Sequence, residues 1–285
     1  MRKNSSIIYL AIIVSFSCNK KLDYNLNNIY QGDKIVLNGF IDSELGCVVK
    51  VSKSSPSTGN YTYEQLKVKD VHVFLYENGD SILELKQDTS GKYTYSSFAP
   101  KIGSRYKIRA TSLTLPECQS EEEIFDEVPL TKNETSVYSN NLSHGDSGVL
   151  FTFDFNLNTK KISYFIFYAK NDIGSTGAYL VNSNIDLSCG IQYLSVYDLV
   201  TSDCFNSGSK VKFEVAPKNL SGKSPTFAKL YISKISSVYY NYIQSLNQPI
   251  NENFAFLEPN TLVTNINGGY GIFYTRNWKV FTYKF

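Results

Sequence analysis

Short runs in which apolar and polar residues alternate are the feature that most constrains the fold of this chain. Alternation with a period of two puts every second side chain on one face, which is the pattern of a half-buried β-strand. The first runs cover residues 35–41, 47–51, 68–76, 82–85, 92–95 and 106–110. Asn78-Gly79 and Ser90-Gly91 lie between runs and suit tight turns. Residues 34–115 are therefore predicted to form a β-sandwich of immunoglobulin-like or transthyretin-like size.

A second set of strand-like runs, together with one helical segment, occupies residues 135–285. The runs cover residues 149–155, 164–169, 179–181, 192–199 and 210–216. Near residues 234–247 apolar side chains recur instead at steps of three and four, and Pro249 follows. These side chains belong to Ile235, Val238, Tyr239, Tyr242, Ile243 and Leu246. The sequence predicts a second β-sandwich-type domain with one amphipathic helix, whose apolar stripe covers an open face of the sheet.

An acidic segment, residues 116–134, separates the two sets of runs. Its carboxylates are Glu117, Glu121, Glu122, Glu123, Asp126, Glu127 and Glu134, and Pro129 lies among them. Charge runs of this kind usually form a solvated surface, so we interpret the segment as a connector between domains. A cation-binding site is the alternative.

The N-terminus has the pattern of a secretion signal. Met1-Arg2-Lys3 is positively charged, residues 7–16 are almost wholly apolar, and Ser17-Cys18 follows. Ten apolar residues in a helix span only about half of a bilayer core of about 30 Å, so this run is too short for a permanent transmembrane helix. Residues 1–17 are therefore expected to be removed.

Cys18 lies where the sequence resembles the lipobox of bacterial lipoproteins, although Ser15 stands where that motif usually has Leu. The resemblance implies that Cys18 becomes the first residue of the mature chain and carries acyl chains. Each buried methylene contributes about 0.8 kcal/mol, and two or more chains anchor a protein stably. Residues 18–33 are polar and lack periodicity, which suits a flexible tether. An ordinary secreted protein with an unmodified Cys18 is the alternative.

Composition excludes several classes of protein. With 42% hydrophobic and 19% charged residues, the chain is not disordered overall. Two of its 28 basic residues, Arg2 and Lys3, lie in the signal, so 26 basic residues balance 26 acidic ones in the mature chain. A neutral chain offers no electrostatic footprint for nucleic acid.

Four cysteines remain after Cys18, an even number in an exported chain, which makes disulfides plausible. Cys189 and Cys204 are 15 positions apart, and closing a loop of that length would stabilise the fold by about 3 kcal/mol. Cys47 with Cys118 follows by elimination, but four cysteines allow three connectivities. A thiolate metal site is the alternative, and it lacks any Cys-x-x-Cys spacing.

Catalytic motifs are not evident in the sequence. Residues 145–148, Gly-Asp-Ser-Gly, resemble the nucleophile loop of trypsin-like proteases, but Val149-Leu150 departs from that family, and neither His72 nor His144 has the context of a catalytic base. We interpret the motif as a polar turn and expect no enzyme, metal or cofactor. A hydrolase with two dispersed carboxylates is the remaining catalytic alternative. The glycine-rich residues 265–273 suit a tight bend or bulge in the last strands.

Aromatic residues are abundant, with 22 Tyr and 18 Phe. Flat rings stack on sugars, so a binding platform is one interpretation. Because Tyr and Phe alternate with other residues in strands, the core or the sheet surface is the favoured place for any single ring.

Several stretches resemble the Bacteroidota lipoproteins catalogued as domain of unknown function 4249. The matching stretches cover residues 36–42, 68–76, 103–108, 232–246 and 265–273. Their order and the final Asn-Ile-x-Gly-Gly-x-Gly-Ile-Phe pattern carry the resemblance. It implies an outer-membrane lipoprotein, commonly encoded beside a TonB-dependent receptor, with no established catalytic residues.

These observations together predict a non-enzymatic, lipid-anchored protein that associates with a TonB-dependent outer-membrane transporter. We expect it on the cell surface rather than on the periplasmic face of the outer membrane. A free-standing carbohydrate- or peptide-binding surface lipoprotein is the alternative.

Overall fold

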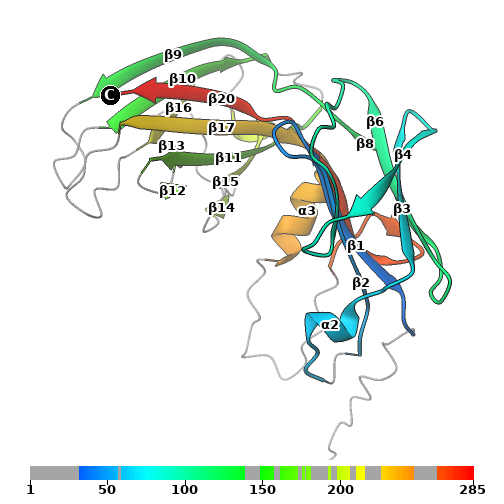
Figure 1. The fold of residues 1–285 in the computed structure, drawn as a ribbon. Helices are drawn as coiled ribbons and strands as arrows, with labels where there is room; N and C mark the ends of the chain where they lie inside the picture. The colour runs from blue at the N-terminus through cyan, green and yellow to red at the C-terminus, as the bar shows by residue number, and fades with distance from the viewer. Residues whose placement is uncertain are drawn as a thin grey trace, which may run out of the picture.

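The computed structural model describes residues 32–56, 59–138, 148–156, 161–172, 175–176, 178–180, 192–193, 198–205, 210–215, 226–246 and 262–285. The chain is mainly β, and its strands form three sheets in two lobes (Figure 1). The helices of the described residues are α2 (Tyr63–Leu66), α3 (Ser237–Leu246) and the 3-10 turn η3 (Ser202–Cys204). The prediction of a mainly β, sandwich-like protein is confirmed.

The N-terminal lobe is built on one ten-stranded sheet whose main path runs β18-β7-β6-β3-β4-β5-β2-β1-β19, with β8 beside β6. Its strands are β1 (Ile35–Asp42), β2 (Gly46–Lys53), β3 (Val71–Glu77), β4 (Asp80–Gln87), β5 (Lys92–Tyr95), β6 (Arg105–Ser112), β7 (Cys118–Ser120), β8 (Glu123–Ile124), β18 (Ile266–Asn267) and β19 (Tyr270–Arg276). Alternation in the sequence fixes which side chains form the core. Ile35, Leu37 and Ile41 of β1 are fully buried, whereas Val36 and Asn38 between them face outward.

The two ends of this sheet meet at the buried side chain of Asn265. Its Nδ2 donates to the carbonyl oxygen of Phe273 at 2.7 Å, and its Oδ1 accepts from the backbone N–H of Phe273 at 2.9 Å. The carbonyl oxygen of Asn265 accepts from the backbone N–H of Glu121 at 2.8 Å. One side-chain amide therefore replaces a pair of ladder hydrogen bonds and closes the sheet around its core.

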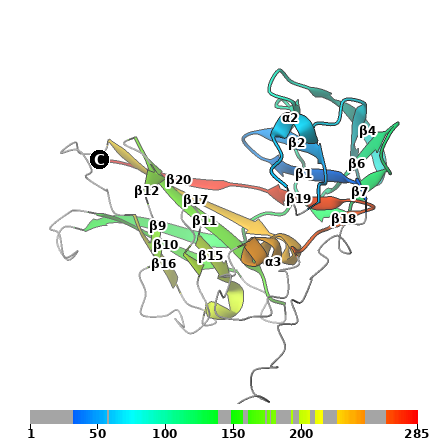
Figure 2. The same cartoon turned by 90° about the horizontal axis from the view of Figure 1, so that it is seen from below.

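The second lobe packs two sheets face to face (Figure 2). One has the order β13-β16-β10-β9, and the other β14-β15-β11-β17-β20 with β12 beside β11. Their strands are β9 (Leu130–Tyr138), β10 (Gly148–Phe155), β11 (Tyr164–Asn171), β12 (Ser175–Thr176), β13 (Ala178–Leu180), β14 (Gln192–Tyr193), β15 (Asp198–Thr201), β16 (Lys210–Val215), β17 (Phe227–Ile235) and β20 (Lys279–Lys284). Phe151 and Phe153 of β10 share a buried cluster with Phe165 and Phe167 of β11.

Helix α3 lies at the junction of the two lobes (Figure 2). Its buried residues Tyr239, Tyr240 and Ile243 share one apolar cluster with Ile166 of β11 and Ile272 of β19. The predicted helix near residues 234–247 is therefore confirmed, and it covers β19 of the N-terminal lobe as well as the second sheet.

The C-terminal segment corrects the predicted domain boundaries. Residues 135–285 do not form one continuous domain, because β19 pairs in parallel with β1, and β18 pairs with β7. The chain then crosses back, and β20 pairs with β17 of the second lobe. Gly271 makes this return possible: its φ is +110°, and a Cβ there would lie 2.1 Å from the carbonyl oxygen of Leu37. The glycine-rich stretch thus lets the last strands approach β1 closely.

The acidic segment, residues 116–134, is a second correction. It is not a solvated connector, because it contains β7, β8 and the start of β9 and buries Ser120, Glu123 and Phe125. Its exposed carboxylates form ion pairs with neighbouring strands. These pairs are Arg109–Glu117 at 2.6 Å, Arg105–Glu122 at 3.8 Å, Lys234–Asp126 at 2.5 Å and Lys279–Glu127 at 2.9 Å. Within the described ranges, no group of three or more His, Cys, Asp or Glu side chains could hold a metal ion.

The search for a membrane span returns no helix of sufficient length and apolarity among the residues that the structure describes.

Candidate functional site

The outward face of β2, β1 and β19 forms the floor of the candidate site. Residues opposite one another in a ladder share a face, so the register defines the rows of this floor. Two rows are Ser52–Val36–Tyr270 and Val48–Phe40–Tyr274, and between them lies Lys50–Asn38–Ile272. Three aromatic rings therefore point outward from β1 and β19, on the side where α3 packs.

A stack of rings joins this floor to α3. The ring of Tyr274 lies 3.6 Å from that of Tyr239, centroid to centroid and nearly parallel. Phe40 lies 5.7 Å from Tyr274, and Tyr242 lies 6.5 Å from Tyr239. Aromatic pairs at these separations stabilise one another beyond the area they bury, so the floor and the helix form a preorganised wall.

Two adjoining cavities open along this wall, and we call them together the tyrosine groove. The larger has a volume of about 580 Å³ and is lined by Val36, Asn38, Ser52, Lys53, Ser54, Ser55, Leu66, Tyr242, Leu262, Val263, Thr264, Tyr270 and Gly271. The smaller has about 410 Å³ and is lined by Asn38, Gly39, Phe40, Tyr239, Tyr242, Ile243, Leu246, Ile272 and Tyr274. Asn38 and Tyr242 line both cavities, so the groove runs from the start of β1 along the side of α3.

The polar end of the groove lies where the chain enters β1. Here Lys53 Nζ lies 3.5 Å from an Asp33 carboxylate oxygen, and Ser54 Oγ donates to the carbonyl oxygen of Gly32 at 3.3 Å. Lys34 Nζ lies 5.3 Å from the centroid of the Tyr270 ring. Gly32 and Asp33, the last two residues of the predicted tether, therefore lie beside this end of the groove.

The groove combines apolar walls with a few groups that form hydrogen bonds. Tyr270 is 37% exposed, so part of its ring is accessible beside Lys34. Burial raises the pKa of Tyr242, so its hydroxyl stays protonated and can donate or accept at neutral pH. Apolar concave surfaces with a few placed polar groups are typical of organic-ligand sites, and the 580 Å³ volume lies within their usual range.

A buried ion pair within the N-terminal lobe fixes the far end of the floor, and Trp278, next to β20 of the second lobe, contacts it. Arg276 donates from an Nη to Asp42 Oδ2 at 2.9 Å, and Trp278 Nε1 donates to the same oxygen at 2.9 Å. The Arg276 guanidinium also lies 4.6 Å from the centroid of Phe40. Since Arg276 ends β19 and Trp278 precedes β20, this contact sets how the chain passes from one lobe to the other.

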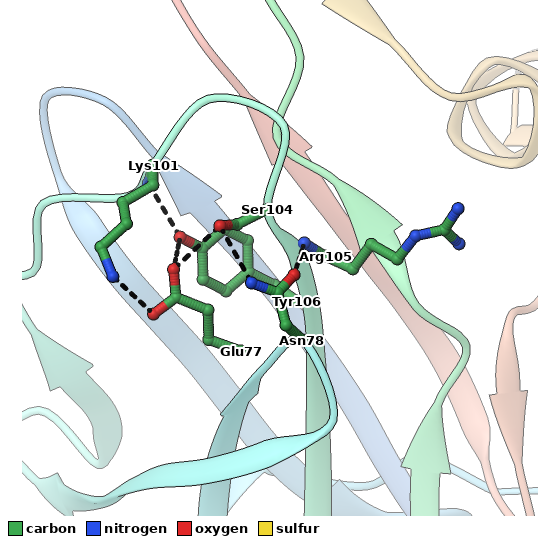
Figure 3. Close-up of polar contacts among 6 residues, drawn as sticks. All are labelled: Glu77, Asn78, Lys101, Ser104, Arg105 and Tyr106. Atoms are coloured by element: carbon green, nitrogen blue, oxygen red, sulfur yellow. Dashed lines mark hydrogen bonds and ion pairs between the residues drawn. The ribbon is translucent and has the colours of Figure 1, made fainter.

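A second polar cluster surrounds Glu77, at the turn between β3 and β4 (Figure 3). Ser104 Oγ and Tyr106 Oη donate to one carboxylate oxygen at 2.9 and 3.1 Å, and Lys101 Nζ lies 3.3 Å from the other. Burial alone would raise the pKa of Glu77, but these hydrogen bonds hold it below its usual value. Both oxygens are already engaged within the lobe, so the cluster stabilises the turn rather than offering a binding site.

The cysteines fall in different places from those predicted. Cys18 and Cys189 lie outside the described residues, so lipidation and the Cys189–Cys204 disulfide stay predictions. Cys204 is buried, and its Sγ lies 3.3 Å from Thr201 Oγ1. The protease-like residues 145–147 also lie outside the described residues.

The structure contradicts the Cys47–Cys118 disulfide, because both are buried free thiols. Cys47 pairs with Ile41, near the end of β1, whereas Cys118 packs below Gly269, close to Ile35 at the start of that strand. Six residues of strand separate those two points by about 20 Å, and a disulfide requires Cα atoms within about 7 Å. Burial raises the pKa of both thiols to about 12.

Sequence reasoning missed the tyrosine groove because it favoured the core or the sheet surface over a binding platform for any single ring. A signal was present: Tyr239 and Tyr242 are three positions apart on the predicted helix, and Tyr270 and Tyr274 share one face of the last strands. What the sequence did not supply was the parallel pairing of β19 with β1, which brings the two sets of rings together.

Comparison with known proteins places the chain in a family. No curated protein matches it. A family model does match, over residues 19–281, and its description is domain of unknown function (DUF4249). The match covers β1 to β19, α3 and the first half of β20, and so includes every element that lines the groove. The chain therefore belongs to the DUF4249 family.

Proposed function

We propose that this protein is a lipid-anchored binding protein of the outer membrane, in a Bacteroidota envelope, that associates with a TonB-dependent transporter and presents a ligand to it. Cys18 carries the anchor, and the two β lobes form a non-catalytic body on the cell surface. The lipobox-like N-terminus supports a lipid anchor. The family resemblance supports localisation to the outer membrane and association with a TonB-dependent transporter.

The observation that carries the binding role is the tyrosine groove. It is preformed, because stacked rings from β1, β19 and α3 hold its wall. It also lies beside the entry of the tether into β1, where Lys53 and Ser54 fix the chain. Even fully extended, a tether of about 16 residues reaches no more than about 55 Å, which keeps the groove near the membrane surface and any partner embedded there.

Affinity purification after mild detergent extraction tests the association. We expect a transporter barrel to be recovered with the wild-type protein. Cys18→Ala should move the protein from the membrane to the soluble fraction, and Cys47→Ala is the matched cysteine control that should stay in the membrane. Recovery of a lone monomer, or membrane retention of Cys18→Ala, would contradict the proposal.

A free-standing carbohydrate- or peptide-binding lipoprotein is the second candidate. The hydrogen-bonding groups that line the groove, Asn38 and Ser52 among them, favour it, because they allow recognition without a transporter. A ligand that raises the melting temperature of the purified protein, with no transporter in the membrane extract, would favour this candidate.

A further inference from the structure

A strip of lysines continues the outward face of the floor away from the groove. Lys50 of β2 lies directly opposite Lys92 of β5, and Lys86 of β4 lies opposite Thr94 in the next row. All three lysines are exposed. We call them the lysine strip.

The lysine strip and the tyrosine groove share a row of the sheet. Lys92, Lys50, Asn38 and Ile272 follow one another across β5, β2, β1 and β19, and Asn38 lines both cavities. Four neighbouring strands cover three strand spacings, or about 14 Å. An elongated ligand could therefore contact the ammonium groups and the rings at the same time.

The strip concentrates positive charge on this face. Lys50 and Lys92 lie directly opposite one another in the ladder, so their ammonium groups can contact one anionic ligand together. Asp88 lies near Lys92, where its carboxylate accepts hydrogen bonds from Ser90 and from the Lys92 backbone N–H. Lys53, the charged residue that lines the larger cavity, pairs with Asp33, so the lysine strip supplies the positive charge that favours an anionic ligand.

The strands of this face offer few free backbone N–H and carbonyl groups to which a peptide strand could hydrogen-bond. β1 lies between β2 and β19, and β2 lies between β1 and β5, so both edges of these two strands are paired. β19 ends the sheet, and the side-chain amide of Asn265 occupies the backbone N–H and carbonyl of its Phe273. Strand addition needs an open edge. Recognition here must come from side chains: flat rings, hydroxyl and amide groups, and ammonium groups.

We propose that the tyrosine groove and the lysine strip together bind an acidic oligosaccharide, with sugar rings on Tyr270 and Tyr242 and carboxylate or sulfate groups on the lysines. The proposal rests on the proposed binding function and names its ligand class. Rings supply apolar faces for sugar rings, Asn38 and Ser52 supply hydrogen bonds, and the lysines supply the charge that a neutral sugar would not use.

Isothermal titration of the purified mature chain tests the ligand class. The probes are an oligogalacturonate, a sulfated oligosaccharide, a neutral oligosaccharide of equal length, and poly-glutamate. We expect at least one acidic oligosaccharide to bind about tenfold more tightly than the neutral one. That affinity should fall as salt rises. The better acidic probe identifies the anionic group.

Matched variants locate the site. Lys50→Gln combined with Lys92→Gln, and separately Tyr270→Ala, should each weaken binding of the acidic probe about tenfold. Lys69→Gln combined with Lys284→Gln is the lysine control, and Tyr95→Ala, which is 38% exposed in the wild type, is the tyrosine control. Thermal melts should show all variants folded, since each changed side chain in the groove and strip is at the surface.

The inference is overturned if no acidic oligosaccharide binds, if poly-glutamate binds as tightly as the sugars, or if the controls weaken binding equally. Recovery of a transporter barrel without acidic-sugar binding would reject the ligand class and leave the proposed association standing. Binding of an acidic oligosaccharide without recovery of a transporter barrel would support the ligand class and reject the proposed association.

Discussion

Gly271 shows at the scale of a residue why the groove exists. Its positive φ and its contact with the Leu37 carbonyl oxygen leave no room for a side chain. We expect Gly271→Ala to lower the free energy of unfolding by about 3 kcal/mol, since strain at positive φ and steric overlap add. Gly79 has a φ of +93° with nothing within 4 Å of an added Cβ, so Gly79→Ala should cost about 1 kcal/mol. If Gly271→Ala and Gly79→Ala lower the free energy of unfolding equally in urea, the close approach of β19 to β1 does not depend on Gly271.

Glu123 makes stability depend on pH. Burial raises its pKa to about 7, although Ser236 and the Asn265 amide, 3.1 Å away, donate hydrogen bonds to it. Burial raises the pKa of Asp198 to about 7 as well. In the unfolded chain both carboxyls titrate near their ordinary values, so the native state binds more protons between about pH 4 and pH 7, and their contribution to stability is lost as pH rises through that window.

Glu123→Gln should therefore be more stable than the wild type at pH 8, by about 2 kcal/mol, and close to it at pH 5. Comparing the two proteins by denaturant unfolding at both pH values removes the contributions of carboxyls that they share. Glu64→Gln, an exposed change, is the control and should leave the difference between pH 5 and pH 8 unaltered. If Glu123→Gln has the same free energy of unfolding as the wild type at pH 8, the Glu123 carboxylate is not a buried charge in the native state.

At the scale of elements, local patterns predict strands well and their partners poorly. The alternation of β1 and the three-and-four spacing of α3 are local, and both elements appear where the sequence predicts them. The partner of β1 is about 230 residues away, and nothing in the period of either strand specifies that pairing. The acidic segment was misread for the same reason, because Lys234 and Lys279 are distant in sequence from Asp126 and Glu127.

The contact of α3 with the floor can be measured through Tyr239. Its ring is buried against Tyr274, so Tyr239→Ala should lower the free energy of unfolding by about 3 kcal/mol. Tyr239→Phe keeps the ring and should cost less than about 1 kcal/mol. Thermal and urea unfolding distinguish the two variants, and equal losses would mean that the hydroxyl, rather than the stack, holds α3.

At the scale of the whole molecule, the buried Asp42–Arg276 pair of the N-terminal lobe holds Trp278, whose ring packs on Tyr168 and Tyr231 of the second lobe. Asp42 is 1% exposed and Arg276 is 9% exposed at their side chains. Removing one partner leaves the other charge buried, so Asp42→Asn should lower the free energy of unfolding by about 3–5 kcal/mol. The exposed Lys279–Glu127 pair is the control, and Lys279→Gln should cost less than about 1 kcal/mol. A smaller loss for Asp42→Asn than for Lys279→Gln would contradict the assignment of this contact.

The return of the C-terminal strand to β1 has a consequence for biosynthesis. A ribosome that has made the first 124 residues has synthesised β1 to β8, but the sheet of that lobe still lacks β18 and β19 and therefore cannot close. The nascent chain must stay open until its final residues emerge, and a premature stop codon anywhere before residue 276 would leave both halves of the protein incomplete.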